Sequence, residues 1–256
     1  MIRSLLLWLT LSTLLAAAET RELYILHTND IHGYVESYEG GGLEKIASLV
    51  ARYRKEHPGQ IVLLDGGDTS LGTPLSGQFY GKPIAEVMDA MDYDAVALGN
   101  HEFNWGKVRM SALAKGINAP VLCANLVRED GKAPPYPAWT LVERNKVKLA
   151  VVSMVTADTP RRAPVASTQD WLFLEPPTAL EVTLPVLPEF DVLVCLNHIG
   201  VEADHELAKA IPEIDLIVGG HSHTALQEAD YESGVPIVQA GCYGQYLGVV
   251  RVEVNT

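Results

Sequence analysis

The sequence repeats one pattern five times: a short apolar run is followed at once by side chains that can bind a metal ion or a phosphate. The apolar runs cover residues 23–26, 61–64, 95–98, 192–196 and 216–218. Continuous apolar runs of this length, bounded by polar or glycine-rich turns, are typical of strands that are buried on both faces. The pattern therefore predicts an α/β fold built on largely parallel strands.

The segments between these runs predict helices. The clearest is 43–56, in which Leu43, Ile46 and Val50 recur at helical spacing while charged residues occupy the other face. Pro58 and Gly59 should end it. Residues 83–91 and 202–210 are further expected helices, so strand and helix alternate as βαβ units.

Three later regions depart from this alternation. Residues 139–143 and 147–154 predict two strands of an antiparallel hairpin that turns at Asn145 and Lys146. Residues 156–178 contain four prolines and predict a long surface loop. Residues 236–253 predict two final strands around the turn 241–244.

The polar residues that follow the apolar runs are candidate metal ligands. The residues that follow parallel strands line a common crevice at the carboxyl ends of the strands, so these candidate ligands should lie close together. They offer nitrogen and oxygen but no thiolate, a donor set that suits zinc, manganese, iron or cobalt. They are too numerous for one metal, and two metals that share a bridging aspartate would use them all: Asp30, His32, Asp68, Asn100, His198, His221 and His223.

Length and charge limit the classes of partner. A chain of 256 residues suits one large domain. Its 19 basic and 32 acidic residues give a net charge of −13, which disfavours duplex nucleic acid. A small phosphorylated molecule remains compatible, because bound cations can reverse the local sign of the charge.

The first 18 residues have the composition of a secretory signal peptide: a basic start, a short apolar stretch and three alanines. The expected product is an exported, periplasmic or extracellular domain over 19–256 with no stable membrane span after cleavage; an uncleaved anchor is the alternative. The three cysteines are an odd number for an exported protein, so at least one should be free or pair between chains. Cys123 and Cys195 lie in apolar runs and should be buried.

Five blocks in this order resemble the calcineurin-like metallophosphoesterases, and within them the 5'-nucleotidase and 2',3'-cyclic phosphodiesterase branch. The resemblance covers nearly all of the chain after the signal peptide, and it implies a four-layer α/β/β/α sandwich that corresponds to the catalytic domain alone. The blocks are His-Thr-Asn-Asp-Ile-His-Gly at 27–33, Asp-Gly-Gly-Asp at 65–68, Ala-Leu-Gly-Asn-His-Glu-Phe at 97–103, Asn-His-Ile-Gly at 197–200 and Gly-Gly-His-Ser-His-Thr at 219–224.

The resemblance also implies a role for each residue. Asp30, His32 and His223 would hold one divalent metal, and Asn100, His198 and His221 would hold the other, with Asp68 bridging. A water activated by the two metals would attack phosphorus. Asn100 and His101 would contact the scissile phosphate, where His101 could stabilise the phosphoryl charge or protonate the leaving alkoxide.

Two departures from the resemblance concern the substrate. The 5'-nucleotidases usually carry aspartate three residues after the catalytic histidine, whereas this chain carries Asn104, which can orient His101 but supplies no charge. The run from 100 to 106 looks more like the cyclic-nucleotide phosphodiesterases. The nucleotidase relatives also have a C-terminal domain that holds the base, and we expect these 256 residues to correspond to the catalytic domain without it.

The alternatives therefore stay open. Hydrolysis of nucleotide monoesters is the leading interpretation, a phosphodiesterase for 2',3'-cyclic nucleotides is second, and a general phosphatase is third. A non-catalytic binding module is less favoured, because all the ligand residues are present. Asp65, Arg161, Arg162 and Tyr243 are expected to have structural or solvated roles, and the oligomeric state is left undecided.

Overall fold

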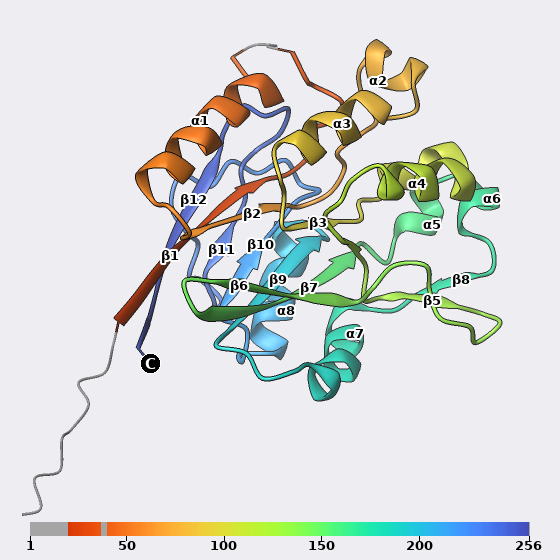
Figure 1. Cartoon of the computed structure of the whole chain (residues 1–256). Helices are drawn as coiled ribbons and strands as arrows, with labels where there is room; N and C mark the ends of the chain where they lie inside the picture. Colours follow the sequence, from red (N-terminus) through yellow and green to blue (C-terminus); the bar gives the residue numbers. More distant parts are fainter. Residues whose placement is uncertain (1–19, 37–39, 256) are drawn as a thin grey trace, which may run out of the picture.

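The computed structural model describes residues 20–36 and 40–255, and two five-stranded sheets dominate them (Figure 1). The predicted signal peptide lies outside the described residues. Sheet 1 has the order β12-β1-β2-β3-β4 and sheet 2 the order β11-β10-β9-β7-β6. In each sheet four neighbouring strands run parallel and one edge strand, β12 or β6, is antiparallel.

The strands of sheet 1 are β1 (Thr20–Thr28), β2 (Ile61–Asp65), β3 (Ala95–Ala97), β4 (Val121–Leu122) and β12 (Gly248–Asn255). Those of sheet 2 are β6 (Trp139–Arg144), β7 (Val147–Val155), β9 (Val192–His198), β10 (Leu216–Val218) and β11 (Ile237–Val238). A small ribbon pairs β5 (Leu126–Arg128) with β8 (Trp171–Phe173).

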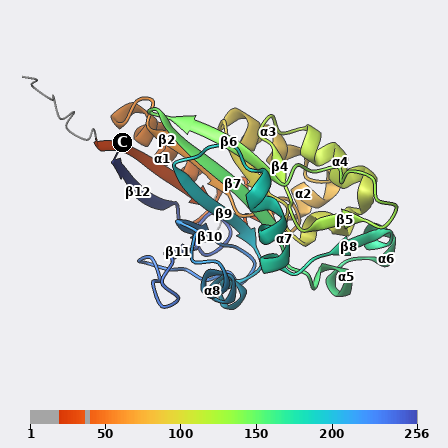
Figure 2. The same cartoon turned by 90° about the horizontal axis from the view of Figure 1, so that it is seen from below.

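Helices cover the outer face of each sheet, which gives four layers in the order α/β/β/α. Figures 1 and 2 show α1, α3 and α4 on the side of sheet 1 and α7 and α8 on the side of sheet 2. The helices are α1 (Leu43–Glu56), α2 (Pro74–Gln78), α3 (Lys82–Ala90), α4 (Gly106–Lys115), α5 (Thr159–Arg162), α6 (Val165–Thr168), α7 (Pro176–Thr183) and α8 (Val201–Ala210). Short 3-10 turns cover His101–Trp105 and Leu184–Val186. Within the described part of the chain, no helix is both long and apolar enough to span a membrane.

The strands are apolar on both faces because each face packs against a different layer. In β1, Leu23 and Ile25 join the core between the two sheets, whereas Leu26 packs under the helices of sheet 1. In β9, Val194 joins the core between the sheets and Cys195 packs with the helices of sheet 2. This double burial explains the continuous apolar runs in the sequence.

Most of the expected elements are confirmed. Helix α1 has the predicted bounds, and α3 and α8 each begin one residue before the predicted start. The hairpin β6–β7 forms, with Asn145 and Lys146 at positive φ in its turn. All three cysteines are free, and Cys123 and Cys195 are fully buried.

The expected loop at 156–178 was wrong as a structureless segment. It contains α5, α6, the strand β8 and the first residues of α7. Its prolines begin these helices instead of preventing them: Pro160 and Pro176 each lie in a first turn, where the missing N–H has no partner to lose. Strand β8 then pairs with β5, which lies far away in the sequence.

Candidate metal centre

The predicted site residues come together where the carboxyl ends of both sheets meet. Asp30 and His32 follow β1, Asp68 follows β2, and Asn100 and His101 follow β3. On the other sheet, His198 ends β9, and His221 and His223 follow β10. The expected convergence of strand ends is therefore observed, although it joins two sheets rather than one.

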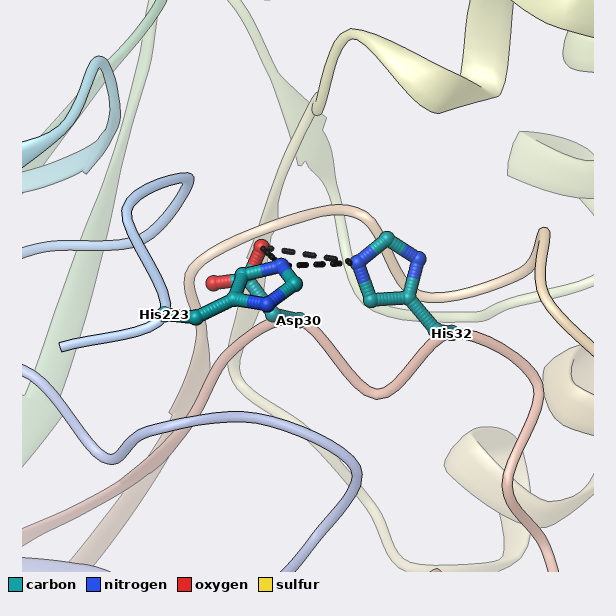
Figure 3. A group of neighbouring side chains, drawn as sticks. All are labelled: Asp30, His32 and His223. Atoms are coloured by element: carbon teal, nitrogen blue, oxygen red, sulfur yellow. Dashed lines mark hydrogen bonds and ion pairs between the residues drawn. The ribbon is translucent and has the colours of Figure 1, made fainter. Parts of the chain in front are cut away.

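The first group consists of Asp30, His32 and His223 (Figure 3). Nε2 of His32 lies 3.1 Å from Nε2 of His223. Oδ1 of Asp30 lies 3.3 Å from the His223 nitrogen and 3.8 Å from the His32 nitrogen. Three potential ligand atoms from two sheets thus face a common point.

The second group consists of Asp68, His198 and His221. Oδ2 of Asp68 lies 3.0 Å from Nε2 of His198, and the imidazoles of His198 and His221 meet edge to face with centroids 5.1 Å apart. The two groups adjoin, since Oδ1 of Asp30 lies 4.0 Å from Nε2 of His198.

Asn100 supplies the clearest sign that this arrangement suits a cation. Its side chain is buried, and its Oδ1 has no hydrogen-bond partner among the described residues. A buried carbonyl oxygen without a partner is costly unless something else satisfies it. Together with the imidazole nitrogens and carboxylates, this oxygen forms a donor set that suits divalent metal ions.

Backbone carbonyls fix the orientation of two imidazoles. Nδ1 of His198 donates to the Gly66 carbonyl at 2.7 Å, and Nδ1 of His32 donates to the Leu71 carbonyl at 2.8 Å. Each bond occupies Nδ1 and leaves Nε2 directed into the cluster. Histidines that ligate metals are commonly oriented by such a bond.

The electrostatics of the cluster follow from burial and close charges. Burial is the largest single influence on the pKa of His198 and lowers it, but the charge and hydrogen bond of Asp68, the charge of Asp30 and the Gly66 carbonyl together outweigh burial and raise the pKa to about 10. Burial opposes ionisation of Asp68 as well, yet His198 holds the pKa of Asp68 well below its ordinary value. Burial, followed by the charge of His198, lowers the pKa of His221 to about 4. The cluster thus keeps the buried carboxylate of Asp68 ionised.

Backbone conformation at the site is unusual. Five of the seven predicted ligands have positive φ: Asp30 (51°), His32 (50°), Asp68 (53°), His221 (75°) and His223 (55°). Residues other than glycine adopt this left-handed region rarely, and each instance costs on the order of 1 kcal/mol or more. The surrounding hydrogen bonds impose it, because the amides of Asp30 and His32 donate to the carbonyls of Gly67 and Asp68.

The carboxylate of Glu102 organises the loops that carry Asp68 and Asn100, and sequence reasoning gave it no role. It is buried and accepts hydrogen bonds from four backbone amides, those of Asp68, Thr69, Ser70 and Gly99, at 2.9–3.3 Å. The hydroxyls of Thr69 and Ser70 also donate to it. Burial raises the pKa of Glu102, and these donors oppose the rise.

Two further buried amides hold the loops and were also missed. Asn29 accepts from the amide of Ala240 and donates to the carbonyl of Gly241 and to Asp30, so it ties the end of β1 to the segment after β11. Gln239 accepts from Ser222 and from the amide of Thr224, on either side of His223. A polar residue next to an apolar run, as at 237–239, was the only sequence signal for Gln239.

His101 lies beside the cluster and is partly open to solvent. Its Nε2 is 4.0 Å from Oδ2 of Asp68, and 39% of its side chain is exposed. Its Nδ1 lies 3.4 Å from Nδ2 of Asn104, and its backbone amide donates to Asp68 at 2.8 Å. The ring is thus held at the open side of the cluster, where a substrate could reach it.

The remaining sequence expectations have mixed outcomes. Asp65 accepts from Thr28 and from the amide of Gly67, which is the expected structural role. Arg161 and Arg162 both pair with Asp158 and are largely exposed. Tyr243 was expected to pack on the sheet, but its ring lies 5.7 Å from those of His32 and His223 and borders the first group.

Fold and site together define a metallophosphoesterase architecture, and comparisons with known proteins agree. The model of the family "calcineurin-like phosphoesterase" matches residues 23–225. The chain belongs to this family.

Similar curated proteins include the 5'-nucleotidase of Bos taurus, at 32% identity, and Protein UshA of Escherichia coli K12, at 30%. The alignments cover 93% and 92% of this chain but only 47% and 50% of those proteins, so the chain spans about half their length.

Similar solved structures are the calcineurin-like phosphoesterase YfkN from Bacillus subtilis and a 5'-nucleotidase precursor from Thermus thermophilus. Both are 26% identical to this chain, with TM-scores of 0.84 and 0.79. The match covers 93% of this chain and 86% of the YfkN chain, and 91% of this chain and 51% of the Thermus chain.

Proposed function

We propose that this chain is a metal-dependent phosphoesterase that hydrolyses phosphate monoesters, with nucleotides as the substrate class. The observation that carries the proposal is the meeting of two imidazole–carboxylate groups at the shared edge of both sheets, with His101 beside them. The names of the similar curated proteins, several of them 5'-nucleotidases, support nucleotides as substrates.

The proposed ligands divide as the two groups do. Asp30, His32 and His223 would hold one divalent ion of manganese, zinc, iron or cobalt. Asn100, His198 and His221 would hold the other. Asp68 would lie between them, which agrees with its contact to His198 and its electrostatic interaction with His32.

Two such ions, when bound, lower the pKa of a water toward ~7 and withdraw charge from the phosphoryl oxygens. The chain's own residues supply the rest. His101, held by Asn104, would donate a proton to the leaving alkoxide or stabilise the phosphoryl charge. The amide of Asn100 would contact the phosphate while its carbonyl faces the second ion.

A second candidate is hydrolysis of 2',3'-cyclic nucleotides, and Asn104 is the observation that favours it. Asn104 contacts His101 without a charge, at the position where the 5'-nucleotidases usually carry aspartate. A general phosphatase remains the third candidate, and a non-catalytic binding module the fourth.

Turnover of three substrates separates these candidates. The purified chain is assayed with AMP, 2',3'-cyclic AMP and bis(p-nitrophenyl) phosphate, each with Mn²⁺ and with chelator. We expect Mn²⁺-dependent cleavage of AMP that chelator and Asp68→Ala abolish, while Asp130→Ala, which alters an exposed ion pair, leaves it intact. Preference for the diesters would establish the second candidate, and binding of Mn²⁺ without any turnover would favour the binding module.

We also propose that the chain is exported, on the composition of its first 18 residues. Expression in a bacterial host should yield a periplasmic or extracellular product whose N-terminus begins after Ala18. A product that keeps Met1 and stays in the membrane fraction would indicate the uncleaved anchor.

A further inference from the structure

We propose a third divalent-cation site, formed by His205, Asp230 and Glu232 and separate from the candidate metal centre. One ligand atom from each of these residues lies within 4.8 Å of the other two. His205 belongs to α8, and the two acidic residues belong to the connection between β10 and β11. The sequence alone does not point to this group, because His205 lies more than twenty residues before Asp230 and Glu232.

The imidazole of His205 is oriented for metal binding. Its Nδ1 lies 3.0 Å from the hydroxyl of Ser233, and its Nε2 lies 3.4 Å from Oδ2 of Asp230. When Nδ1 donates to the hydroxyl, the lone pair of Nε2 faces Asp230. Only 16% of the side chain is exposed, so the ring is held in this position.

The connecting loop presents its carboxylates in a fixed conformation. The amide and carbonyl of Asp230 both pair with Ile237, each at 2.9 Å. Oδ1 of Asp230 accepts from the amide of Glu232 at 2.8 Å, which leaves Oδ2 for the side that faces α8. Gly234, with a φ of 89°, closes the turn. Glu232 is exposed, so its carboxylate can adjust to an ion.

The charge and the donor types of the group favour a transition-metal dication. A neutral imidazole with two carboxylates carries a charge of −2. Lys209 interacts electrostatically with Glu232, but its hydrogen bond is to Glu206, at 2.9 Å. Imidazole nitrogen and carboxylate oxygen together suit Zn²⁺ or Mn²⁺. The net charge of the chain, −13, further favours binding of a cation.

A bound ion would join α8 to the β10–β11 connection. The first amide of α8, that of Val201, already donates to Ser222, which lies between His221 and His223. The ion would therefore stabilise the segment that carries His221 and His223, which are candidate ligands of the metal centre. Its expected effect is on stability, and the chemistry of the centre does not require it.

The test is calorimetric titration of the chelator-stripped chain with Zn²⁺, using the wild type, His205→Ala, Glu232→Gln and the control His57→Ala. We expect the wild type and the control to bind one more Zn²⁺ per chain than His205→Ala. Glu232→Gln should weaken that additional binding step at least ~10-fold. Hydrolysis with saturating Mn²⁺ should be the same in all four proteins.

Equal stoichiometry and affinity in the wild type and His205→Ala would overturn the proposal. So would a change of the Mn²⁺-dependent turnover in His205→Ala, because the site would then not be separate. The readout counts bound ions, so a chain that binds the additional Zn²⁺ but hydrolyses nothing would contradict only the proposed function.

Discussion

The carboxylate of Asp68 lies 3.0 Å from Nε2 of His198, although Asp68 follows a strand of one sheet and His198 ends a strand of the other. Both side chains are buried. The candidate metal centre is therefore a property of the interface between the two sheets. Either sheet alone would present only part of the donor set.

Asn100→Ala should separate function from folding. Because Oδ1 of Asn100 has no partner among the residues described, its removal should change the free energy of unfolding by less than ~1 kcal/mol. Hydrolysis with Mn²⁺ should fall at least ~10–100-fold, since an ion would lose a ligand. Urea denaturation in chelator and turnover with Mn²⁺ measure the two effects. Loss of stability with unchanged turnover would argue for a purely structural Asn100.

Glu102→Gln should destabilise the fold. The glutamine NH₂ group would face backbone amides that now donate to the carboxylate, and each buried donor left without an acceptor costs ~1–3 kcal/mol. We expect a loss of at least ~2 kcal/mol in urea denaturation.

The matched control is Glu86→Gln, which removes only an exposed ion pair with Lys82 and should cost less than ~0.5 kcal/mol. Equal losses of unfolding free energy in the two variants would show that the hydrogen bonds to the Glu102 carboxylate contribute little to stability.

Asn104→Asp should change how the rate depends on pH. A carboxylate beside Nδ1 of His101 would favour the imidazolium form of His101. If His101 is the general acid, it would then stay protonated up to a higher pH. The alkaline limb of the kcat profile should move upward by roughly one pH unit. Asn118→Asp adds the same charge before β4, at the opposite end of sheet 1, and should leave the profile in place. If the pH dependence of kcat were the same in Asn104→Asp and the wild type, His101 would not be the proton donor.

Asp65→Asn should remove a pH dependence of stability. Burial raises the pKa of Asp65 from 3.8 to about 8, so between these values the folded chain binds a proton that the unfolded chain releases. The stability contribution of Asp65 is therefore complete below about pH 4 and is lost as the pH rises through 8, by at most ~1.4 kcal/mol per pH unit.

The asparagine variant lacks this group, so its stability relative to the wild type should increase from pH 5 to pH 8 in urea denaturation. A difference that stays constant over this range would show that Asp65 is ionised in the folded chain.

The sequence could predict those parts of the fold in which burial leaves a regular pattern of apolar residues. Strands buried on both faces produce continuous apolar runs, and α1 shows one apolar stripe with Pro58 and Gly59 beyond it. The segment 156–178 lacked such a cause, because β8 exists through its pairing with the distant β5. The division into two sheets came from the family resemblance alone.

The candidate site divides in the same way. The seven ligand candidates could be located because each follows an apolar run, and the structure brings them together. The sequence could not identify Glu102, Asn29 and Gln239 as part of the site, because their hydrogen-bond partners are backbone groups of other loops. The His205 group was equally hidden, since Asp230 and Glu232 approach α8 only after the chain has folded.

The left-handed backbone at five ligand candidates has a consequence for protein engineering. Glycine or asparagine would adopt these conformations with less strain, so a chain selected only for thermal tolerance would replace aspartate and histidine there. A redesign of this chain that was guided by stability alone would therefore favour substitutions that remove candidate metal ligands, unless those five positions were held fixed.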